Sequence, residues 1–338
     1  MPTIEWKDGV VVTIDQTQLP NKTVLLEMKN CKEIAKAIKN MQIRGAPLLG
    51  AAAAYGLALT AHNSKARDKQ QIVEKLEASA RLLRKTRPTA VNLFWAINRV
   101  LEKAKKVAGN ASLVGEVVIE EAQQIAHEDV DVNLRIGKHG SSLIDKGDTV
   151  LTHCNAGSLA TVDYGTALSV IRAAWNDNKD VKVIATETRP LLQGARLTAY
   201  ELHRDGIPVT LITDSMVGYV MSKGLVQKVF VGADRIVRDA VINKIGTYSV
   251  AVLAQKHKVP FYVAAPKSTF DVKRTSKDVV IEERSMEEVV NFRGIRIAPE
   301  GVSALNPAFD ITPLPYITRV ICEEGVISPA DLQKFSTT

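Results

Sequence analysis

The chain has 338 residues, which is enough for about two domains with cores of their own. A hydrophobic content of 46% and a charged content of 24% are ordinary for a globular protein, and an aromatic content of 5% argues against a surface that stacks single-stranded nucleic acid. The net charge of +7 favours an anionic partner such as a phosphorylated metabolite, a nucleic acid or an acidic protein. Because lysines and arginines are spread along the chain, small clusters such as residues 103–106 are interpreted as solvated helix faces.

The cysteines and the apolar stretches indicate the compartment. Cys31, Cys154 and Cys322 have no metal-ligand spacing and cannot all be paired, which fits a reducing cytosol. The first residues lack the basic-then-apolar order of a signal peptide. The uncharged residues 45–61 are alanine- and glycine-rich and too short to span a membrane, so they predict a buried helix. We therefore expect a soluble cytoplasmic protein without a membrane partner.

Residues 1–128 are predicted to form a small β element followed by a helical domain. Strand-like runs at 3–6 and 10–15 flank a turn at Lys7-Asp8-Gly9. From residue 31 to 125 the hydrophobic periodicity is helical. Its breaks are at Gly45/Pro47, Arg87/Pro88 and Gly109-Asn110. Residues 112–144 predict one long or twice-broken helix, and we place the domain boundary inside it, near residue 128.

From Gly147 onward, short β-branched runs alternate with helical windows. The runs cover residues 148–153, 181–186, 207–212, 228–232 and 259–264. This alternation is typical of βαβ units, so residues 129–338 are predicted to form a Rossmann-like α/β domain with a parallel sheet. No Gly-x-Gly-x-x-Gly, Walker loop or zinc-type spacing is present, so we expect neither a dinucleotide nor a metal. The tail from residue 295 is predicted to wrap the surface and to end in a short helix after Ser328-Pro329.

Two chemically active side chains stand where predicted strands end. Thr152-His153-Cys154-Asn155-Ala156-Gly157 follows one run, and Asp234 follows the run 229–233. Ligands bind at the carboxyl ends of the strands in open α/β sheets. Cys154 is there a candidate acid, base or nucleophile, and Asp234 is a candidate proton donor. The alternatives are a small buried hydrophobe for the cysteine and an ion pair with Arg235 for the aspartate.

Other residues have the chemistry of an anion or sugar site. Arg44-Gly45-Ala46-Pro47 precedes a predicted helix start, where free backbone N–H groups beside an arginine can bind an anion. Arg87 before Pro88 has the same potential, and a purely structural role is the alternative for both arginines. Asn243-Lys244 is predicted to open a helix, where a lysine opposes the positive end of the dipole and so indicates an anionic partner. Gln193 can hydrogen-bond sugar hydroxyls.

The ordered set of motifs resembles the methylthioribose-1-phosphate isomerases. These belong to a wider group that includes archaeal ribose-1,5-bisphosphate isomerase and the regulatory subunits of translation initiation factor 2B. The resemblance runs from about Ile14 to Ile327. The motifs that carry it are Arg44-Gly45-Ala46-Pro47, Arg87-Pro88-Thr89-Ala90-Val91-Asn92-Leu93, the stretch around Cys154, Thr186 to Leu197, Asp214-Ser215-Met216, Val231 to Ile236 and Asn243 to Tyr248.

The resemblance implies an aldose–ketose isomerase that converts 5-methylthioribose 1-phosphate to 5-methylthioribulose 1-phosphate in methionine salvage. It implies that Cys154 and Asp234 are the catalytic pair. The implied substrate-binding residues are Arg44, Gly45, Ala46, Arg87, Gln193, Asn243 and Lys244. We accordingly expect a phosphorylated sugar as the partner, no cofactor, no metal, no nucleic acid, and a homodimer.

Two alternatives stay open. One is ribose-1,5-bisphosphate isomerase, and the other is a non-catalytic regulatory subunit of the translation factor. Ala240-Val241-Ile242 and Tyr219 depart from the methylthio enzyme and resemble the wider group. Thr161-Val162-Asp163-Tyr164-Gly165 and Leu191-Leu192-Gln193 look like the methylthio enzyme, and the presence of both Cys154 and Asp234 argues against a non-catalytic subunit.

Overall fold

The computed structural model describes residues 2–335, and the chain divides into two compact units. Unit 1 comprises Met1–Arg135 and Gly157–Thr166, and unit 2 comprises Ile136–Ala156 and Ala167–Thr338. The boundary expected near residue 128 falls inside helix α5 (Ala111–Ser141), on the unit 1 side of the division. Residues 157–166 return to unit 1 after unit 2 has begun.

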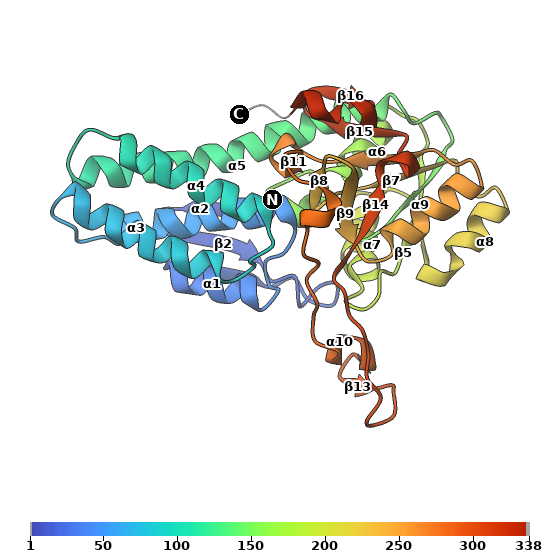
Figure 1. The fold of residues 1–338 in the computed structure, drawn as a ribbon, viewed down its shortest axis with the longest axis horizontal. Helices are drawn as coiled ribbons and strands as arrows, with labels where there is room; N and C mark the ends of the chain where they lie inside the picture. The colour runs from blue at the N-terminus through green and yellow to red at the C-terminus, as the bar shows by residue number, and fades with distance from the viewer. Residues whose placement is uncertain (1, 336–338) are drawn as a thin grey trace. The chain divides into compact units, whose positions relative to one another are not determined.

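Unit 1 combines a small antiparallel sheet with long helices (Figure 1). Its strands are β1 (Ile4–Lys7), β2 (Val10–Ile14) and β3 (Leu25–Met28). Its helices are α1 (Cys31–Lys39), α2 (Ala46–His62), α3 (Lys69–Arg84), α4 (Val91–Lys106) and most of α5, with the 3₁₀ turn η1 (Ser158–Ala160) from the returning segment. The predicted hairpin, the three predicted helix breaks and the unbroken long helix are confirmed. Strand β3 and the break between α2 and α3 were not predicted.

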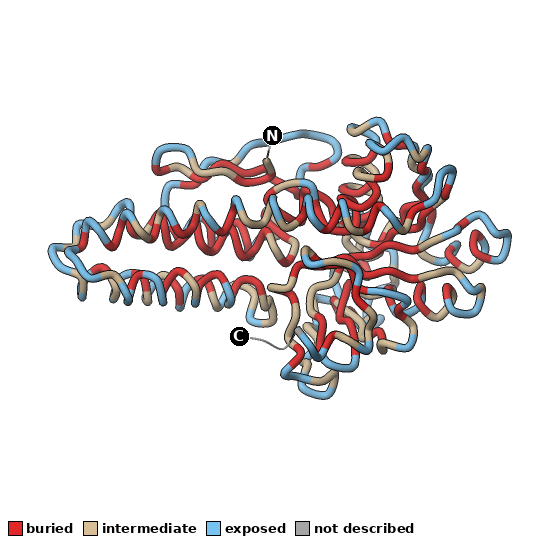
Figure 2. Tube along the Cα trace, turned by 90° about the horizontal axis from the view of Figure 1, so that it is seen from above, coloured by how far each residue is buried: buried red, intermediate tan, exposed pale blue. Residues whose placement is uncertain are grey.

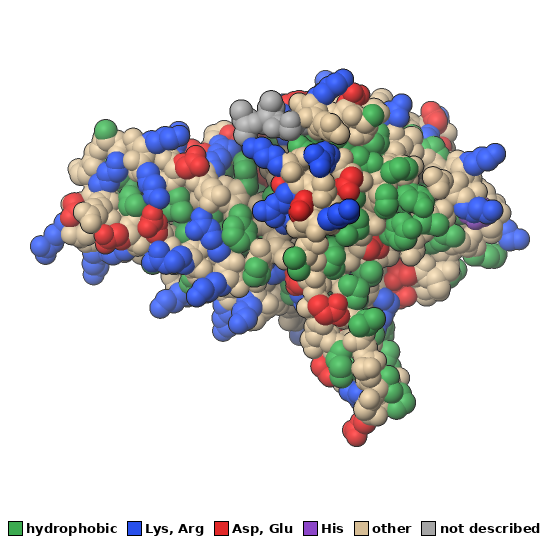
Figure 3. Space-filling view, in the orientation of Figure 1, with side chains coloured by type: hydrophobic (Ala, Val, Ile, Leu, Met, Phe, Trp, Pro, Cys, Tyr) green, Lys and Arg blue, Asp and Glu red, His purple; other side chains and the backbone are tan. Residues whose placement is uncertain are grey.

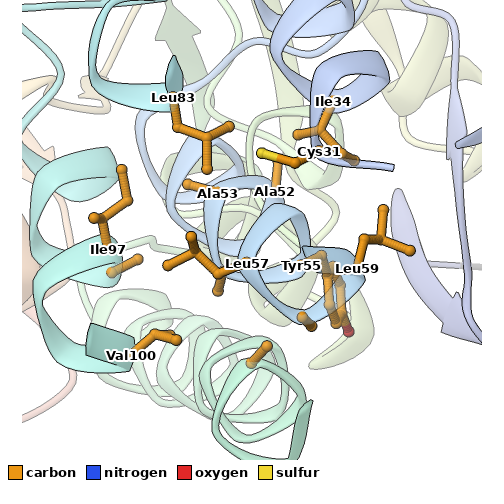
Figure 4. Packing of buried hydrophobic residues seen from close by; sticks show 14 of the residues in the cluster. Cys31, Ile34, Ala52, Ala53, Tyr55, Leu57, Leu59, Leu83, Ile97 and Val100 are labelled. Atoms are coloured by element: carbon orange, nitrogen blue, oxygen red, sulfur yellow. The ribbon is translucent and has the colours of Figure 1, made fainter. Parts of the chain in front are cut away.

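Helix α2 lies at the centre of the core of unit 1. Its uncharged, alanine-rich sequence buries nearly every side chain, as the sequence predicts. Figure 4 shows Ala53 and Leu57 of this helix among side chains of its neighbours, including Leu83 from α3 and Ile97 from α4. In Figure 2, the helices of unit 1 other than α2 alternate between buried and exposed residues along their length. Among residues 2–335, no helix is both long and apolar enough to cross a membrane.

Unit 2 is built on a seven-stranded sheet with the order β16-β15-β10-β7-β4-β5-β6. The strands are β4 (Thr149–Thr152), β5 (Lys182–Thr186), β6 (Val209–Ile212), β7 (Lys228–Val231), β10 (Phe261–Ala264), β15 (Arg319–Cys322) and β16 (Gly325–Ile327). All neighbours are parallel except the edge strand β16. The first six strands along the chain therefore have the spatial order 3-2-1-4-5-6 of a Rossmann fold. The predicted fold class and all five predicted strands are confirmed.

Helices connect these strands, as right-handed βαβ crossovers require. They are α6 (Ala167–Asn176), α7 (Ala199–Arg204), α8 (Val217–Ser222), α9 (Thr247–Lys256) and α10 (Glu287–Val290). Shorter turns are the π-helical turn η2 (Gly194–Thr198) and the 3₁₀ helices η3 (Asp214–Met216), η4 (Lys267–Thr269), η5 (Ser276–Asp278), η6 (Leu314–Tyr316) and η7 (Pro329–Phe335). The last of these confirms the predicted terminal helix as far as the described residues reach.

Unit 2 contains further strands that the sequence did not predict. A second sheet has the order β11-β8-β9-β14. Its strands are β8 (Arg235–Val237), β9 (Ala240–Lys244), β11 (Phe270–Asp271) and β14 (Phe309–Pro313). Strands β12 (Asn291–Phe292) and β13 (Ile295–Arg296) form a hairpin beside α10, on an arm that extends from the rest of unit 2 in Figure 1. The tail thus contributes strands β14, β15 and β16 and does not merely wrap the surface.

Candidate active site

Cys154 and Asp234 lie at the carboxyl ends of two neighbouring parallel strands. Cys154 follows β4 and Asp234 follows β7, and Leu151 of β4 is opposite Val229 of β7 in the sheet. The chain order of the strands reverses between β4 and β7, because β5 and β6 continue on one side and β10 on the other. This switch point is where open α/β sheets bind ligands.

The backbone of Cys154 is fixed by two threonines from the segment after β5. Cys154 is half-buried and has a left-handed backbone with φ of 64°, which is uncommon for a residue with a side chain. Its N–H donates to Thr188 Oγ1 at 2.9 Å, and its C=O accepts from Thr198 Oγ1 at 2.6 Å. Both backbone groups are therefore paired on the same neighbouring segment, and the direction in which the thiol leaves the chain is set.

The residues on either side of Cys154 are also anchored. Asn155 Nδ2 donates to Glu201 Oε1 at 2.8 Å, and the fully buried Glu201 is paired with Arg172 Nη2 at 2.8 Å. His153 lies between Thr186 Oγ1, 2.7 Å from Nδ1, and the Ile245 carbonyl, 2.8 Å from Nε2. Burial lowers the pKa of His153, so the imidazole is neutral at pH 7. We therefore assign His153 a hydrogen-bonding role beside Cys154 and not the role of an acid or a base.

Asp234 is tied to the strand that carries Asn243 and Lys244. The Asp234 N–H donates to the Ile242 carbonyl at 3.0 Å, which extends the pairing of β8 with β9 by one step. The carboxylate is half-buried. The neighbouring Arg235 lies 3.7 Å from Asp271, measured between Nη1 and Oδ2.

Asn243 and Lys244 end strand β9, so the prediction that they open a helix is wrong. Helix α9 begins at Thr247, behind Gly246. Strand β9, to which they belong, pairs with β8 on one side and with β14 on the other. This pairing with other segments determines the conformation more strongly than the local sequence pattern does. The argument that Lys244 opposes a helix dipole, and so indicates an anionic partner, is therefore wrong as well.

Both side chains are buried and hydrogen-bonded. Asn243 Nδ2 donates to Thr247 Oγ1 at 3.0 Å. Lys244 Nζ donates to the Ala308 carbonyl at 2.5 Å and lies 5.1 Å from the ring centroid of Phe309. The carbonyl and the aromatic face stabilise the buried ammonium group, and a cation at this place can also attract an anionic ligand.

Gln193 is buried, and its amide oxygen has no hydrogen-bond partner among the described residues. It stands at the first turn of the helix after β5, directly before Gly194. A Cβ on Gly194 would lie 1.7 Å from the Thr186 carbonyl oxygen, so only glycine lets this helix approach the strand end so closely. An unpartnered buried acceptor is costly unless a ligand completes it, and a sugar hydroxyl would do so.

Arg44, Gly45, Ala46 and Arg87 lie in unit 1. Helix α2 begins at Ala46 with Pro47 in its first turn, so the predicted helix start is confirmed. Gly45 has φ of 99°, and a Cβ there would lie 2.5 Å from backbone atoms of Ala160. Arg44 is buried, and Arg87 Nη1 lies 3.4 Å from Met41 Sδ.

The structure thus places the predicted site residues in two sets. Cys154, Asp234, Gln193, Asn243 and Lys244 lie on four segments of unit 2, whereas the two arginines belong to unit 1. Sequence reasoning missed Thr188 and Thr198, which hold Cys154, although Thr188 stands in the motif Thr186 to Leu197 that it singled out and Thr198 directly follows that motif. Residues 2–335 contain no group of three or more His, Cys, Asp or Glu side chains placed to hold a metal ion.

A parallel sheet of Rossmann order with a cysteine and an aspartate at its switch point places the chain among α/β proteins with a ligand site at the strand ends. A family model described as the initiation factor 2 subunit family matches residues 42–329. The chain belongs to this family.

Some of the proteins that are similar to this chain are named as isomerases, and others are named as translation initiation factor subunits. A putative methylthioribose-1-phosphate isomerase of Archaeoglobus fulgidus is 56% identical over 97% of this chain and 96% of its own length. A crystal structure of 5-methylthioribose 1-phosphate isomerase from Pyrococcus horikoshii has a TM-score of 0.92 and 46% identity, covering 99% of this chain and 95% of that one. A crystal structure described as the delta subunit of translation initiation factor eIF-2B from A. fulgidus has a TM-score of 0.88 and 55% identity, covering 98% and 97%.

Proposed function

We propose that this protein isomerises 5-methylthioribose 1-phosphate to 5-methylthioribulose 1-phosphate. The observation that carries the proposal is the pairing of Cys154 and Asp234 at the ends of β4 and β7, the switch point of the sheet. The names of relatives that share about half of its residues over nearly the whole chain support the choice of substrate. The reaction is an intramolecular oxidoreduction, because C1 is reduced while C2 is oxidised.

The substrate explains why two proton-transfer groups are needed. Its anomeric oxygen carries the phosphate, so the ring cannot open as a free hemiacetal does. In our proposal Asp234 donates a proton to the ring oxygen, and the bond from that oxygen to C1 breaks. Hydrogen then moves from C2 to C1 by one of two routes. In the hydride route it shifts directly with its electron pair to the cationic C1; in the enol route Cys154 takes the proton from C2 and returns it to C1. The proton that leaves the C2 hydroxyl restores the acid.

The remaining residues are assigned to binding. We assign a role in binding the anionic substrate to Lys244, and the resemblance to the isomerases suggests the same role for Arg44 and for Arg87, since ammonium and guanidinium groups bind phosphate oxygens by charge-assisted hydrogen bonds. We assign the sugar hydroxyls to Gln193 and Asn243. The buried, unpartnered amide oxygen of Gln193 supports its role.

A non-catalytic role in translation is the second candidate, because a relative of 55% identity is described as a translation factor subunit. A third is isomerisation of ribose 1,5-bisphosphate, which would need a further cation for the second phosphate. The three candidates differ in what the purified protein turns over.

The test is a coupled assay of the purified protein with each sugar phosphate. We expect kcat/KM for 5-methylthioribose 1-phosphate to exceed that for ribose 1,5-bisphosphate by at least about a hundredfold, because burying an unpaired phosphate in place of a thioether is costly. Cys154→Ser and Asp234→Asn should each lower kcat by at least about a hundredfold. Turnover of neither sugar would favour the translation role, and preference for the bisphosphate would change the substrate. The expected homodimer stays a prediction, which light scattering can check.

A further inference from the structure

We infer that Thr188 is the positioning residue for Cys154. Asp214 holds Thr188 directly, and His153 holds it through Thr186. The inference rests on the proposed function in one respect, the catalytic role of Cys154. The hydrogen bonds themselves are independent of any substrate.

The conformation of Thr188 is the first observation. Thr188 is fully buried and has φ of 64°, a left-handed backbone that a β-branched residue strongly disfavours. Its N–H donates to Asp214 Oδ1 at 2.8 Å, and the next N–H, of Arg189, donates to Asp214 Oδ2 at 2.7 Å. One carboxylate therefore accepts two consecutive backbone N–H groups and stabilises the unfavourable turn.

The direction of the side-chain hydrogen bonds is the second observation. The Ile245 carbonyl can only accept, so Nε2 of the neutral His153 carries the proton and Nδ1 accepts from the Thr186 hydroxyl. With its own proton committed, Thr186 Oγ1 accepts from Thr188 Oγ1 at 3.1 Å. The Thr188 oxygen is then left to accept the Cys154 N–H at 2.9 Å.

The result is a chain of hydrogen bonds with a single direction. It runs from the Cys154 N–H through two hydroxyls to His153, and it ends at the carbonyl of Ile245, next to the substrate-binding Lys244. Thr188 is the member that touches Cys154. Without the Thr188 hydroxyl, Cys154 in its left-handed turn loses the hydrogen bond that its N–H donates to Thr188 Oγ1.

The test compares Thr188→Val, which is isosteric but lacks the hydroxyl, with Thr188→Ser, which keeps it. Thr188→Ala is the second variant without a hydroxyl, in case valine does not fold at this backbone angle. Thr312→Val is the matched control, because Thr312 is equally buried in unit 2 and its hydroxyl has no hydrogen-bond partner among the described residues. Circular dichroism verifies that each variant is folded.

The first readout is hydrogen exchange of the Cys154 amide, which needs no substrate. We expect Thr188→Val or Thr188→Ala to speed this exchange by about tenfold or more, while the amides of β4 exchange as in the wild type. Thr188→Ser and Thr312→Val should exchange as the wild type does. Faster exchange along the whole of β4, or no change at Cys154, would overturn the inference.

The second readout is the split between kcat and KM for the sugar phosphate. A misdirected thiol should lower kcat by about tenfold or more and leave KM within about twofold, with recovery in Thr188→Ser. An unchanged kcat in a variant that exchanges faster would refute the positioning role. If the wild-type protein turns over neither sugar, the proposed function fails, and the exchange measurement still decides whether Thr188 holds Cys154.

Discussion

At the scale of single residues, the geometry of the strand-end site depends on the absence of a side chain at Gly194. Gly194 allows the helix after β5 to start against the strand itself, and Thr198 of this helix hydrogen-bonds the carbonyl of Cys154. Any side chain at this position would meet a backbone oxygen, and backbone cannot move aside as the end of a flexible side chain can. The close approach therefore depends on one hydrogen atom in place of a methyl group.

We expect Gly194→Ala to destabilise the protein by about 3 kcal/mol or more, at the upper end of what overpacking costs, because its Cβ would lie 1.7 Å from the Thr186 oxygen. Urea unfolding measures the effect. Gly218→Ala is the matched control, since a Cβ on this helical glycine of α8 would make an ordinary contact of 3.6 Å with Leu253. The control should be neutral or stabilised by up to about 1 kcal/mol. Equal stability of the two variants would contradict the argument.

At this scale the sequence predicts chemistry better than it predicts contacts. The strand-end placement of Cys154 and Asp234 followed from β-branched runs alone, because such runs are local patterns. The partners of Cys154 are Thr188 and Thr198, which lie more than 30 residues further along the chain and meet it only when β4 and β5 pair. No local pattern contains that information.

The secondary-structure elements show the same difference. Local sequence patterns predict some of them, and pairing with distant segments determines the others. Five strands of the main sheet, β4, β5, β6, β7 and β10, were predicted within a few residues because each is a short apolar run. Strand β9 was misread as a helix start, because its pairing with β14 joins Asn243 to Asp310, far along the chain. Strands β14 to β16 were hidden by the proline and asparagine residues around them.

Helix α5 carries a titratable residue whose role belongs to the element scale. Asp129 Oδ2 accepts the Val162 N–H at 2.7 Å and Asn133 Nδ2 at 3.1 Å, which ties the returning segment 157–166 to the helix. Burial, and to a smaller extent the nearby Asp163, raise the pKa of Asp129 to about 7 against the lowering effect of these two donors. The folded protein thus keeps a proton here that the unfolded chain loses near pH 4.

A raised carboxyl pKa makes stability fall as pH rises. The contribution of protonated Asp129 is complete below the unfolded pKa of about 4 and is lost as pH passes through about 7. In Asp129→Asn, a neutral amide keeps an acceptor and does not titrate. We expect the melting temperature of this variant, relative to the wild type, to increase steadily from pH 5 to pH 8. A constant difference across that range would show that Asp129 is ionised in the folded protein throughout.

Over the whole molecule, the net charge of +7 favours encounter with a phosphorylated substrate. Figure 3 shows lysine and arginine side chains spread over the visible face among acidic ones, and not gathered into a single patch. Such a charge distribution acts at long range and is screened by salt, since the Debye length falls from about 30 Å at 0.01 M to about 3 Å at 1 M. It affects capture of the substrate and not the chemical step.

We therefore expect kcat/KM for the sugar phosphate to fall by several-fold between about 0.01 M and 0.5 M potassium chloride, while kcat stays nearly constant. Initial rates at low and saturating substrate separate the two constants. Sucrose at matched viscosity controls for slower diffusion. A kcat/KM that does not respond to salt would mean that capture depends on short-range contacts alone.

The returning segment 157–166 has a consequence for how the protein is made. Thr3 N–H donates to the Val162 carbonyl at 2.8 Å, Thr3 Oγ1 donates to the Ser158 carbonyl at 2.7 Å, and Gln16 Nε2 donates to the Leu159 carbonyl at 2.7 Å. These hydrogen bonds must therefore wait until residues 158–162 have left the ribosome. Those residues are synthesised only after β4 and the loop that carries Cys154. At the usual pace of translation, about 5–20 residues per second, that wait lasts on the order of ten seconds or more. The amino-terminal unit can therefore complete its native hydrogen bonds only after the first part of the other unit has been synthesised.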